Sequence, residues 1–430
     1  MIIIELFFIL FVVFFCSYTK KTHRILYLLC ILLPIHDIIK FYVFSTGGSF
    51  FSFWKEIAIL IYASRTIKIN TYIFPSYFVL ILLSFIYSVV GIINGFSIAT
   101  DLKCYLFPGL LVVGCRYITL TPANIVKMGL CLCLSFSILN FTGVLDFVSP
   151  ELRYKFRDVW GYDYTYGEDG TVYYSLSSMK ILGYERVAGL SSGPNSLGIN
   201  NSFFLYYLFM IYNLFKKSII NNKWFLGIFI VSFSLSSFCL IFSFSRVGIA
   251  ILIISILIYL YNQNLISRKI IPLIIILSII GVVAVFVSPI VYKVFDATFS
   301  GNEASSAKRG SMTISALNFL LSHPVGYGLG ATYHTSSYTA FHFSELAFIN
   351  IGIQIGVWGL FVLSIFYWEI LQKLKQNETN LVARFGRSFL IAIFIASWVS
   401  VNTFQNPFIY LSWIFLAMSC SKFKTIVKHK

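Results

Sequence analysis

Long apolar runs, separated by short polar segments, repeat from one end of this 430-residue sequence to the other. Crossing a bilayer takes about 20 consecutive apolar residues, because the backbone polar groups must all be satisfied within a helix. Only 11% of the residues are charged, against roughly 25% in soluble domains. The sequence therefore predicts an all-α polytopic membrane protein with about 12 to 14 transmembrane helices. The runs lie near residues 1–18, 25–45, 50–64, 72–94, 104–120, 123–146, 195–215, 223–243, 247–262, 270–292, 346–371, 388–404 and 407–420.

The basic residues are concentrated in every second loop between these runs. Lys and Arg are enriched in short loops that remain in the cytoplasm, so this alternation predicts an external N-terminus and a cytoplasmic C-terminus. The net charge of +16 is thereby explained by membrane topology, and no nucleic-acid partner is expected. The residues concerned are Lys20, Lys21, Arg24, Arg65, Lys68, Arg116, Lys127, Lys216, Lys217, Lys223, Arg268, Lys269, Lys373, Lys375, Arg384, Arg387, Lys422, Lys424, Lys428 and Lys430.

Two long polar segments fall on the external side under this topology. They divide the chain into N-terminal transmembrane helices (1–146), a first large loop (147–194), central transmembrane helices (195–292), a second large loop (293–345) and C-terminal transmembrane helices with a basic tail (346–430). All eight cysteines lie in or beside apolar runs. This placement is typical of packing residues and predicts neither a disulfide framework nor a zinc site. No metal and no cofactor are expected.

The first large loop combines aromatic rings with carboxylates. Tyr162, Tyr164 and Tyr166 stand close to Asp163 and Glu168 in the sequence. An aromatic ring stacks on the C–H face of a pyranose, and a carboxylate accepts hydrogen bonds from its hydroxyl groups. The three tyrosines are therefore candidate sugar-binding residues. The alternative is that they gather at the membrane interface only because tyrosine is amphipathic.

Two arginines border the helices that follow this loop. Arg186 precedes a Ser-Gly-Pro turn at 192–194, which is typical of a helix start whose free N–H groups can meet an anion. The alternative is that Arg186 simply extends to water. Arg246 lies between two apolar runs with almost no loop around it. An arginine at membrane depth must face protein or an anion, unless the segment is a short external turn that leaves it solvated.

The second large loop carries a third arginine and two residues suited to proton transfer. Arg309 begins a modestly amphipathic stretch, and His342 and Glu345 stand three residues apart where the run at 346–371 begins. That spacing puts both side chains on one face of a helix, near the membrane surface. Either side chain can take a proton when burial and neighbouring groups tune its pKa.

Four short motifs follow one another along the chain. They are Arg-x-x-Gly-(x)4-Pro-Asn from Arg186, Ser-Arg-x-Gly from Ser245, His-Pro-x-Gly-x-Gly from His323 and His-x-Ser-Glu-Leu from His342. Their order and spacing over residues 186–360 resemble the O-antigen polymerase and ligase superfamily. The Ser-Glu element that follows His342 is more similar to the Wzy-type O-antigen polymerases than to the ligases.

The resemblance implies a glycosyltransferase that acts at the periplasmic face of the bacterial inner membrane in lipopolysaccharide O-antigen biosynthesis. It would transfer a growing glycan from undecaprenyl pyrophosphate to the next lipid-linked repeat unit. Arginine suits the pyrophosphate because its planar fork binds phosphate oxygens bidentately and stays charged. The implied pyrophosphate-binding residues are Arg186, Arg246 and Arg309. Arg246 is also a candidate catalytic residue, together with His342 or Glu345 as the base that activates the acceptor hydroxyl.

One feature of the polymerases is not met. Their loops often place a glycine after an arginine and ten further residues. Here Gly198 stands one residue too far from Arg186, and Arg309 has no glycine at that spacing. This departure leaves the roles of the individual arginines open.

Two other functions remain open beside the polymerase. One is an O-antigen ligase, which passes the finished glycan to lipid A core. The other is a flippase or transporter, for which His36, Asp37, Lys40, Lys55 and Glu56 in or beside the second and third runs are suitable ionisable residues. The expected partners are the bilayer and undecaprenyl-pyrophosphate-linked oligosaccharides, and a chain-length regulator membrane protein is a further candidate.

Overall fold

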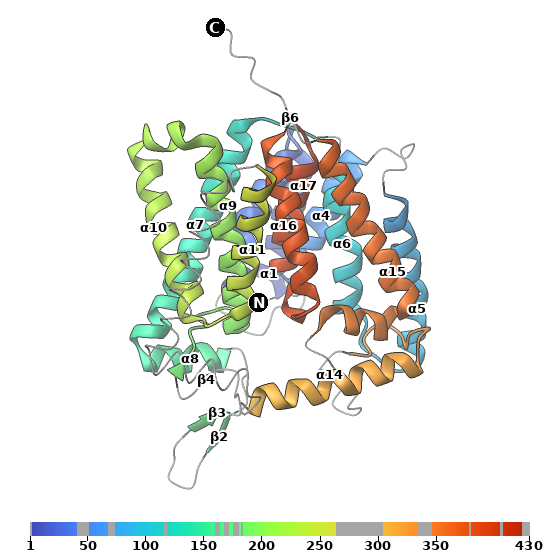
Figure 1. Ribbon diagram of the computed structural model, residues 1–430. Coiled ribbons are helices and arrows are strands. Elements are labelled where there is room, and N and C mark those ends of the chain that lie inside the picture. Colours follow the sequence, from blue (N-terminus) through green and yellow to red (C-terminus); the bar gives the residue numbers. More distant parts are fainter. Residues whose placement is uncertain are drawn as a thin grey trace.

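The computed structural model in Figure 1 shows a bundle of long helices that lie side by side. Most of them run from one end of the bundle to the other. The structure describes residues 2–40, 51–67, 74–115, 118–159, 164–166, 172–174, 180–181, 184–263, 304–332, 346–377, 380–404 and 407–423. The α-helices in these ranges are α1 (Ile2–Tyr18), α2 (His23–Leu32), α3 (His36–Ile38), α4 (Trp54–Thr66), α5 (Pro75–Ile93), α6 (Ala99–Cys115), α7 (Pro122–Val148), α8 (Pro150–Val159), α9 (Pro194–Ile220), α10 (Lys223–Phe242), α11 (Arg246–Asn262), α14 (Ala304–Ser322), α15 (Ala347–Gln376), α16 (Leu381–Ser397) and α17 (Phe408–Cys420).

The all-α polytopic fold expected from the apolar runs is confirmed. Twelve of the thirteen runs overlap one of these helices, and the run at 270–292 lies outside the described residues. Within the described part of the chain, α5, α7, α10 and α15 are long and apolar enough to cross a membrane individually. Others, such as α2 and α17, are shorter apolar helices.

Several helices begin at capping residues that the sequence makes visible. The side-chain oxygens of Thr121, Asn222, Ser245 and Asn380 accept hydrogen bonds from backbone N–H groups in the first turns of α7, α10, α11 and α16. Such caps satisfy donors that have no partner inside the helix. Proline occupies the first turn of α5 and α7, where its missing N–H costs nothing.

One helix starts earlier than its apolar run. The run near 388–404 excluded Arg384 and Arg387, which were expected in a loop, yet both lie within α16. Arg384 Nη1 donates to Gln263 Oε1 at 2.7 Å, and Arg387 Nη2 donates to Asn262 Oδ1 at 2.6 Å. These hydrogen bonds to the end of α11 allow the charged first turns to be helical.

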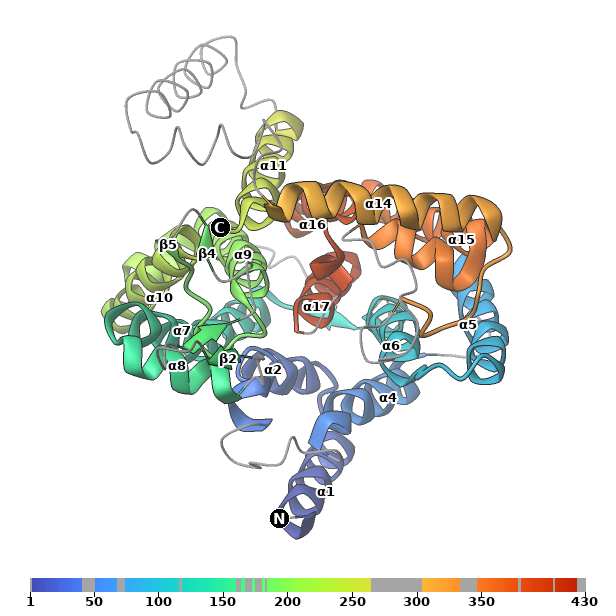
Figure 2. The same cartoon turned by 90° about the horizontal axis from the view of Figure 1, so that it is seen from below.

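The helix α17 occupies the centre of the bundle. Figure 2 shows it surrounded by other helices, and it contacts α6, α9, α15 and α16. Every residue from Phe408 to Cys420 is buried. Because neighbouring helices cover every face of α17, it forms the core on which the outer helices pack.

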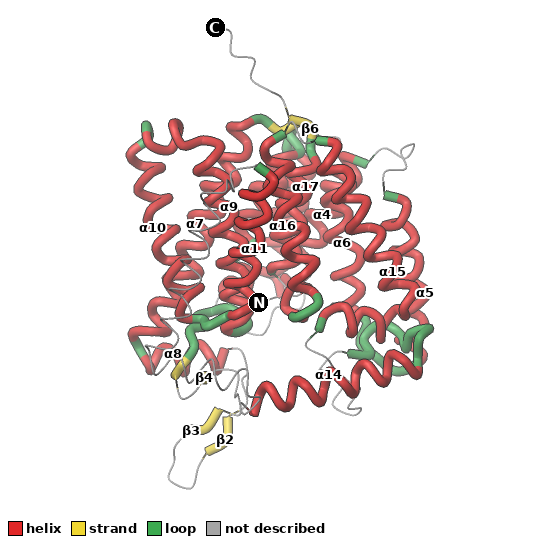
Figure 3. Tube along the Cα trace, viewed as in Figure 1, coloured by secondary structure: helices red, strands yellow, loops and turns green. Residues whose placement is uncertain are grey.

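The described parts of both long polar segments lie at the same end of the bundle (Figure 1). This end, the α14 end, carries α8 and α14 together with two antiparallel ribbons. One ribbon pairs β2 (Tyr164–Tyr166) with β3 (Val172–Tyr174), and the other pairs β4 (Lys180–Ile181) with β5 (Tyr184–Glu185). At the opposite end, β1 (Thr119–Leu120) pairs in parallel with β6 (Lys422–Phe423). Figure 3 shows strands at the two ends and helices through the body between them.

The helix α15 is broken near the α14 end. Gly356 adopts φ +74° and ψ 172° inside it, a conformation that only glycine adopts without strain. The break releases the carbonyl groups of Ile353 and Gln354, which accept hydrogen bonds from Tyr327 N and Gly328 N at 2.8 and 3.0 Å. The His-Pro-x-Gly-x-Gly segment thus packs directly on the broken helix.

Candidate functional site

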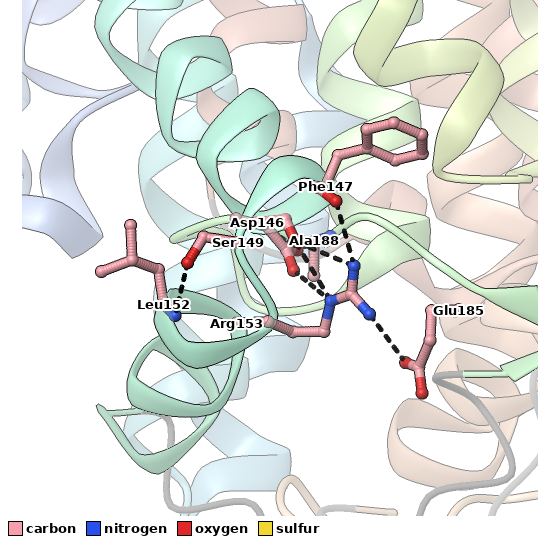
Figure 4. A network of polar contacts seen from close by, with 8 residues as sticks. Asp146, Phe147, Ser149, Leu152, Arg153, Glu185 and Ala188 are labelled. Atoms are coloured by element: carbon pink, nitrogen blue, oxygen red, sulfur yellow. Dashed lines mark hydrogen bonds and ion pairs between the residues drawn. The ribbon is translucent and has the colours of Figure 1, made fainter.

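A buried carboxylate at the end of α7 holds the turn that contains Arg186. Asp146 is 2% exposed, and its Oδ2 accepts hydrogen bonds from Ala188 N and Gly189 N at 2.7 and 2.8 Å. Its Oδ1 pairs with Arg153 Nε at 3.1 Å. Figure 4 shows Arg153 between Asp146 and Glu185, which lies at 4.0 Å from Arg153 Nη1. The turn is therefore tied to two helices of the bundle.

Glycine is required at the centre of this turn. Gly189 has φ +54°, and a Cβ atom added there would lie 2.8 Å from Gly143 N. The next residue, Leu190, donates its N–H to Thr142 Oγ1 at 3.1 Å. The Arg-x-x-Gly motif therefore reflects close packing of the turn on α7.

The guanidinium group of Arg186 is buried and does not extend to water, since the residue is 4% exposed. Its Nε donates to Ser243 O at 2.9 Å, and its Nη2 donates to Asn195 Oδ1 at 2.6 Å. The neighbouring Val187 N donates to Phe242 O at 3.0 Å. Arg186 thus joins the start of α9 to the turn between α10 and α11.

That second turn is sharp and carries Arg246. Phe244 has φ +48°, which is unusual for a residue with a bulky side chain. Ser245 follows it and caps α11, accepting a hydrogen bond from Gly248 N at 3.2 Å. Arg246 is the first residue of α11 and its side chain is exposed.

Two glycines bring α9 and α11 into contact at this point. A Cβ atom at Gly198 would lie 2.6 Å from Ser243 Oγ and 2.8 Å from Ser245 Oγ, and one at Gly248 would lie 2.7 Å from Gly198 O. The two helices can approach so closely because neither has a side chain here. The segments of Arg186 and Arg246 therefore meet at the α14 end.

Of the other predicted site residues, some lie in described elements and some lie outside the described residues. Arg309 lies in α14, which crosses the same end of the bundle (Figure 1). Tyr164 and Tyr166 lie in β2, opposite Tyr174 and Val172 of β3. The remaining site predictions, Tyr162, His342 and Glu345, lie outside the described residues.

A second polar cluster joins α6 and α15 to the glycine-rich segment. Asp101 Oδ2 accepts hydrogen bonds from Gly330 N at 3.1 Å and Gln354 Nε2 at 2.9 Å. Gln354 Nε2 also donates to Thr332 Oγ1 at 2.7 Å, and Gln354 Oε1 accepts from Tyr105 OH at 2.9 Å. A carboxylate with two donors is well suited to hold a loop in place.

The sequence did not predict three features of these sites. They are Asp146, the role of Asn195 as a partner of Arg186, and the Asp101 cluster. A carboxylate at the end of an apolar run is a usable signal, because a charge there needs partners. Asp146 ends the run at 123–146, and Asp101 lies just before the run that begins at residue 104. Their partners could not be read from the chain, since Asp146 and Ala188 are separated by 42 residues.

The geometry suits the binding of an anion next to Arg186 and Arg246. The first turns of α9 and α11 both start at this contact, and helix N-termini carry free N–H groups and partial positive charge. Within the described ranges, no three His, Cys, Asp or Glu side chains are grouped as metal ligands. Arginine side chains and the partial positive charge of two helix N-termini are thus what the described site offers to an anion.

One comparison with known families matches a segment that contains part of this site. Residues 231–364 match the family model described as O-antigen ligase, and this match contains the Ser-Arg-x-Gly, His-Pro-x-Gly-x-Gly and His-x-Ser-Glu-Leu motifs but not the turn of Arg186. The search of curated proteins found no match. Members of the matched group are glycosyltransferase-like enzymes, both polymerases and ligases. Residues 231–364 of this multi-pass membrane protein are therefore similar to the O-antigen polymerase and ligase superfamily.

Proposed function

We propose that the protein is an O-antigen polymerase that joins undecaprenyl-pyrophosphate-linked repeat units at the periplasmic face of the inner membrane. The observation that carries this proposal is the contact between the segments of Arg186 and Arg246 at the end that also bears α14. Two arginine-bearing segments and two helix N-termini converge there, which suits a diphosphate headgroup. The predicted positive-inside topology puts this end in the periplasm.

In the proposed reaction, a hydroxyl oxygen of the acceptor repeat attacks the anomeric carbon of the donor glycan. A new glycosidic bond forms while the bond from that carbon to the pyrophosphate oxygen breaks. Arg246 and Arg309 bind the leaving undecaprenyl pyrophosphate and stabilise its developing charge. The two described hydrogen bonds of Arg186 are to protein oxygens. Arg186 therefore adds positive charge to the site from within the protein and does not bind the pyrophosphate directly. The acceptor proton passes to His342 or Glu345, and tyrosines 162, 164 and 166 stack on the sugars.

The experiment that tests this function uses purified protein in liposomes with one synthetic lipid-linked repeat unit. A polymerase converts the single repeat into a ladder of longer products. A flippase would move the repeat across the bilayer without lengthening it, so the absence of a ladder together with transport would refute the proposal.

The role of Arg246 is tested in the same assay. Removing a well-placed electrostatic donor costs on the order of a hundredfold to a thousandfold in rate, so Arg246→Ala should almost abolish the ladder. The side chain is exposed, and the variant should insert and fold normally. Wild-type polymer from correctly inserted Arg246→Ala protein would contradict the assignment.

The second candidate function is an O-antigen ligase, which is favoured by the description of the matching family model. The two enzymes share the donor chemistry and differ in the acceptor. Adding lipid A core to the liposomes separates them, because a ligase transfers glycan to the core and makes no ladder without it. In cells, loss of a polymerase leaves single-repeat lipopolysaccharide, whereas loss of a ligase leaves bare core.

A further inference from the structure

The helix α14 lies across one end of the bundle, crosswise to the helices that run through the body. Figure 1 shows it beneath the other helices, and Figure 2, seen from below, shows it crossing over α15 and α16. One face packs on the bundle through Ala316 and Leu320, which form a small core with Ile349 and Ile353 of α15. Gly352 leaves room for Leu320 in this contact.

A second side of α14, turned away from this core, exposes large apolar side chains. Ile314, Leu317 and Leu321 are 62%, 43% and 69% exposed. They stand three and four residues apart, so they form one stripe along the helix. Asn318 and Ser322 lie beside this stripe and are also exposed. The uncovered surface of α14 therefore has an apolar strip with a polar border.

This strip continues onto the exposed apolar surface of α15. Val325, just after α14, is 66% exposed. The adjacent Pro324 accepts a hydrogen bond from Val357 N of α15 at 2.9 Å. From there, Val357, Trp358 and Phe361 are exposed along α15, one of the helices able to span a membrane. Trp358 follows the break in α15 at Gly356, and tryptophan is enriched at the membrane–water interface.

We propose that α14 is an interfacial helix, with Ile314, Leu317 and Leu321 immersed in the boundary between headgroups and acyl chains. Helices that lie in this plane have an apolar face and a polar face. Continuity with the exposed face of α15 favours lipid as the occupant over a second protein. This placement concerns the surface of α14 alone and holds whichever glycosyl transfer the protein performs.

A fluorescent probe on α14 tests this placement. Leu317→Cys and Ile314→Cys are each labelled with an environment-sensitive dye in protein reconstituted in phosphatidylglycerol–phosphatidylethanolamine vesicles, and Ser322→Cys on the polar border is the matched control. Unmodified protein gives the labelling background, because its cysteines are buried or half-buried. We expect blue-shifted emission at 314 and 317, with quenching by nitroxide lipids at least twofold stronger than at 322. Iodide should quench most strongly at 322.

Two outcomes would overturn the proposal. One is equal quenching by aqueous iodide at all three positions, which would place the stripe in water. The other is shielding of 314 and 317 from both quenchers, persisting in dilute detergent, which would mean that protein covers the stripe. Neither readout requires enzymatic activity.

Discussion

A single methyl group at Gly198 should remove most of the proposed polymerase activity by separating the segments of Arg186 and Arg246. The Cβ atom of alanine there would lie 2.6 Å from Ser243 Oγ and 2.8 Å from Ser245 Oγ, and it would also meet Ser245 Cβ. Non-bonded carbon contacts are comfortable at about 3.5 to 4.0 Å, so α9 and the turn must separate by roughly 1 Å. The turn leads directly into Arg246.

The expected loss of rate follows from this displacement. A misplacement of about 1 Å in a catalytic site can cost on the order of a hundredfold in rate. Overpacking a close contact also destabilises a protein by roughly 1 to 3 kcal/mol. Alanine recovers up to about 1 kcal/mol of helix propensity, so Gly198→Ala should fold with a modestly lower stability and lose most of its activity.

Gly227→Ala is the matched control. Gly227 lies inside α10, and an added Cβ atom there meets nothing within 4 Å. The same substitution at this position should therefore keep full activity and equal or higher stability. Both variants are measured by the rate of ladder formation in liposomes and by thermal unfolding in detergent. Wild-type ladder formation by Gly198→Ala would refute the link between the close helix contact and catalysis.

Three further predictions concern the charged groups. Arg186→Lys should slow the ladder about a hundredfold, because the ammonium group keeps the charge but cannot reproduce the fork that bonds both Ser243 O and Asn195 Oδ1, so the turn before Arg246 is misplaced; a rate within threefold of wild type would be evidence against it. Asp146→Asn should lower the free energy of unfolding by about 3 kcal/mol, because it leaves Arg153 without its closest charge partner. The exposed Glu151→Gln is its control, and equal thermal midpoints for the two variants would contradict the argument. Polymerisation should persist in chelator if arginines neutralise the pyrophosphate, whereas abolition by EDTA with recovery in magnesium would show that a divalent ion is needed.

The helical elements follow largely from local chemistry. Apolar runs of sufficient length specify helices in lipid, and caps such as Thr121 and Ser245 define where some of them begin. The first turns of α16 were predicted wrongly because Arg384 and Arg387 resemble loop residues until their partners on α11 are known.

The candidate site was predictable only in part. Arg186, Gly189 and Asn195 stood out as one motif, but the sequence left open whether Arg186 extends to water. The answer depends on Ser243, which is 57 residues away and becomes a partner only when α9, α10 and α11 pack together. Arg246 shows the same dependence, because its location at the α9–α11 contact results from Gly198 and Gly248.

Residue order and composition alone establish a polytopic helical membrane chain, the short motifs and the concentration of basic residues in alternate loops, because hydropathy and charge act locally along the chain. Packing alone determines that Asp146 anchors the Arg186 turn, that Gly356 opens α15 to the glycine-rich segment, and that α14 lies across the bundle with an uncovered apolar strip. Those features arise from contacts between residues far apart in sequence, whose partners no local pattern encodes.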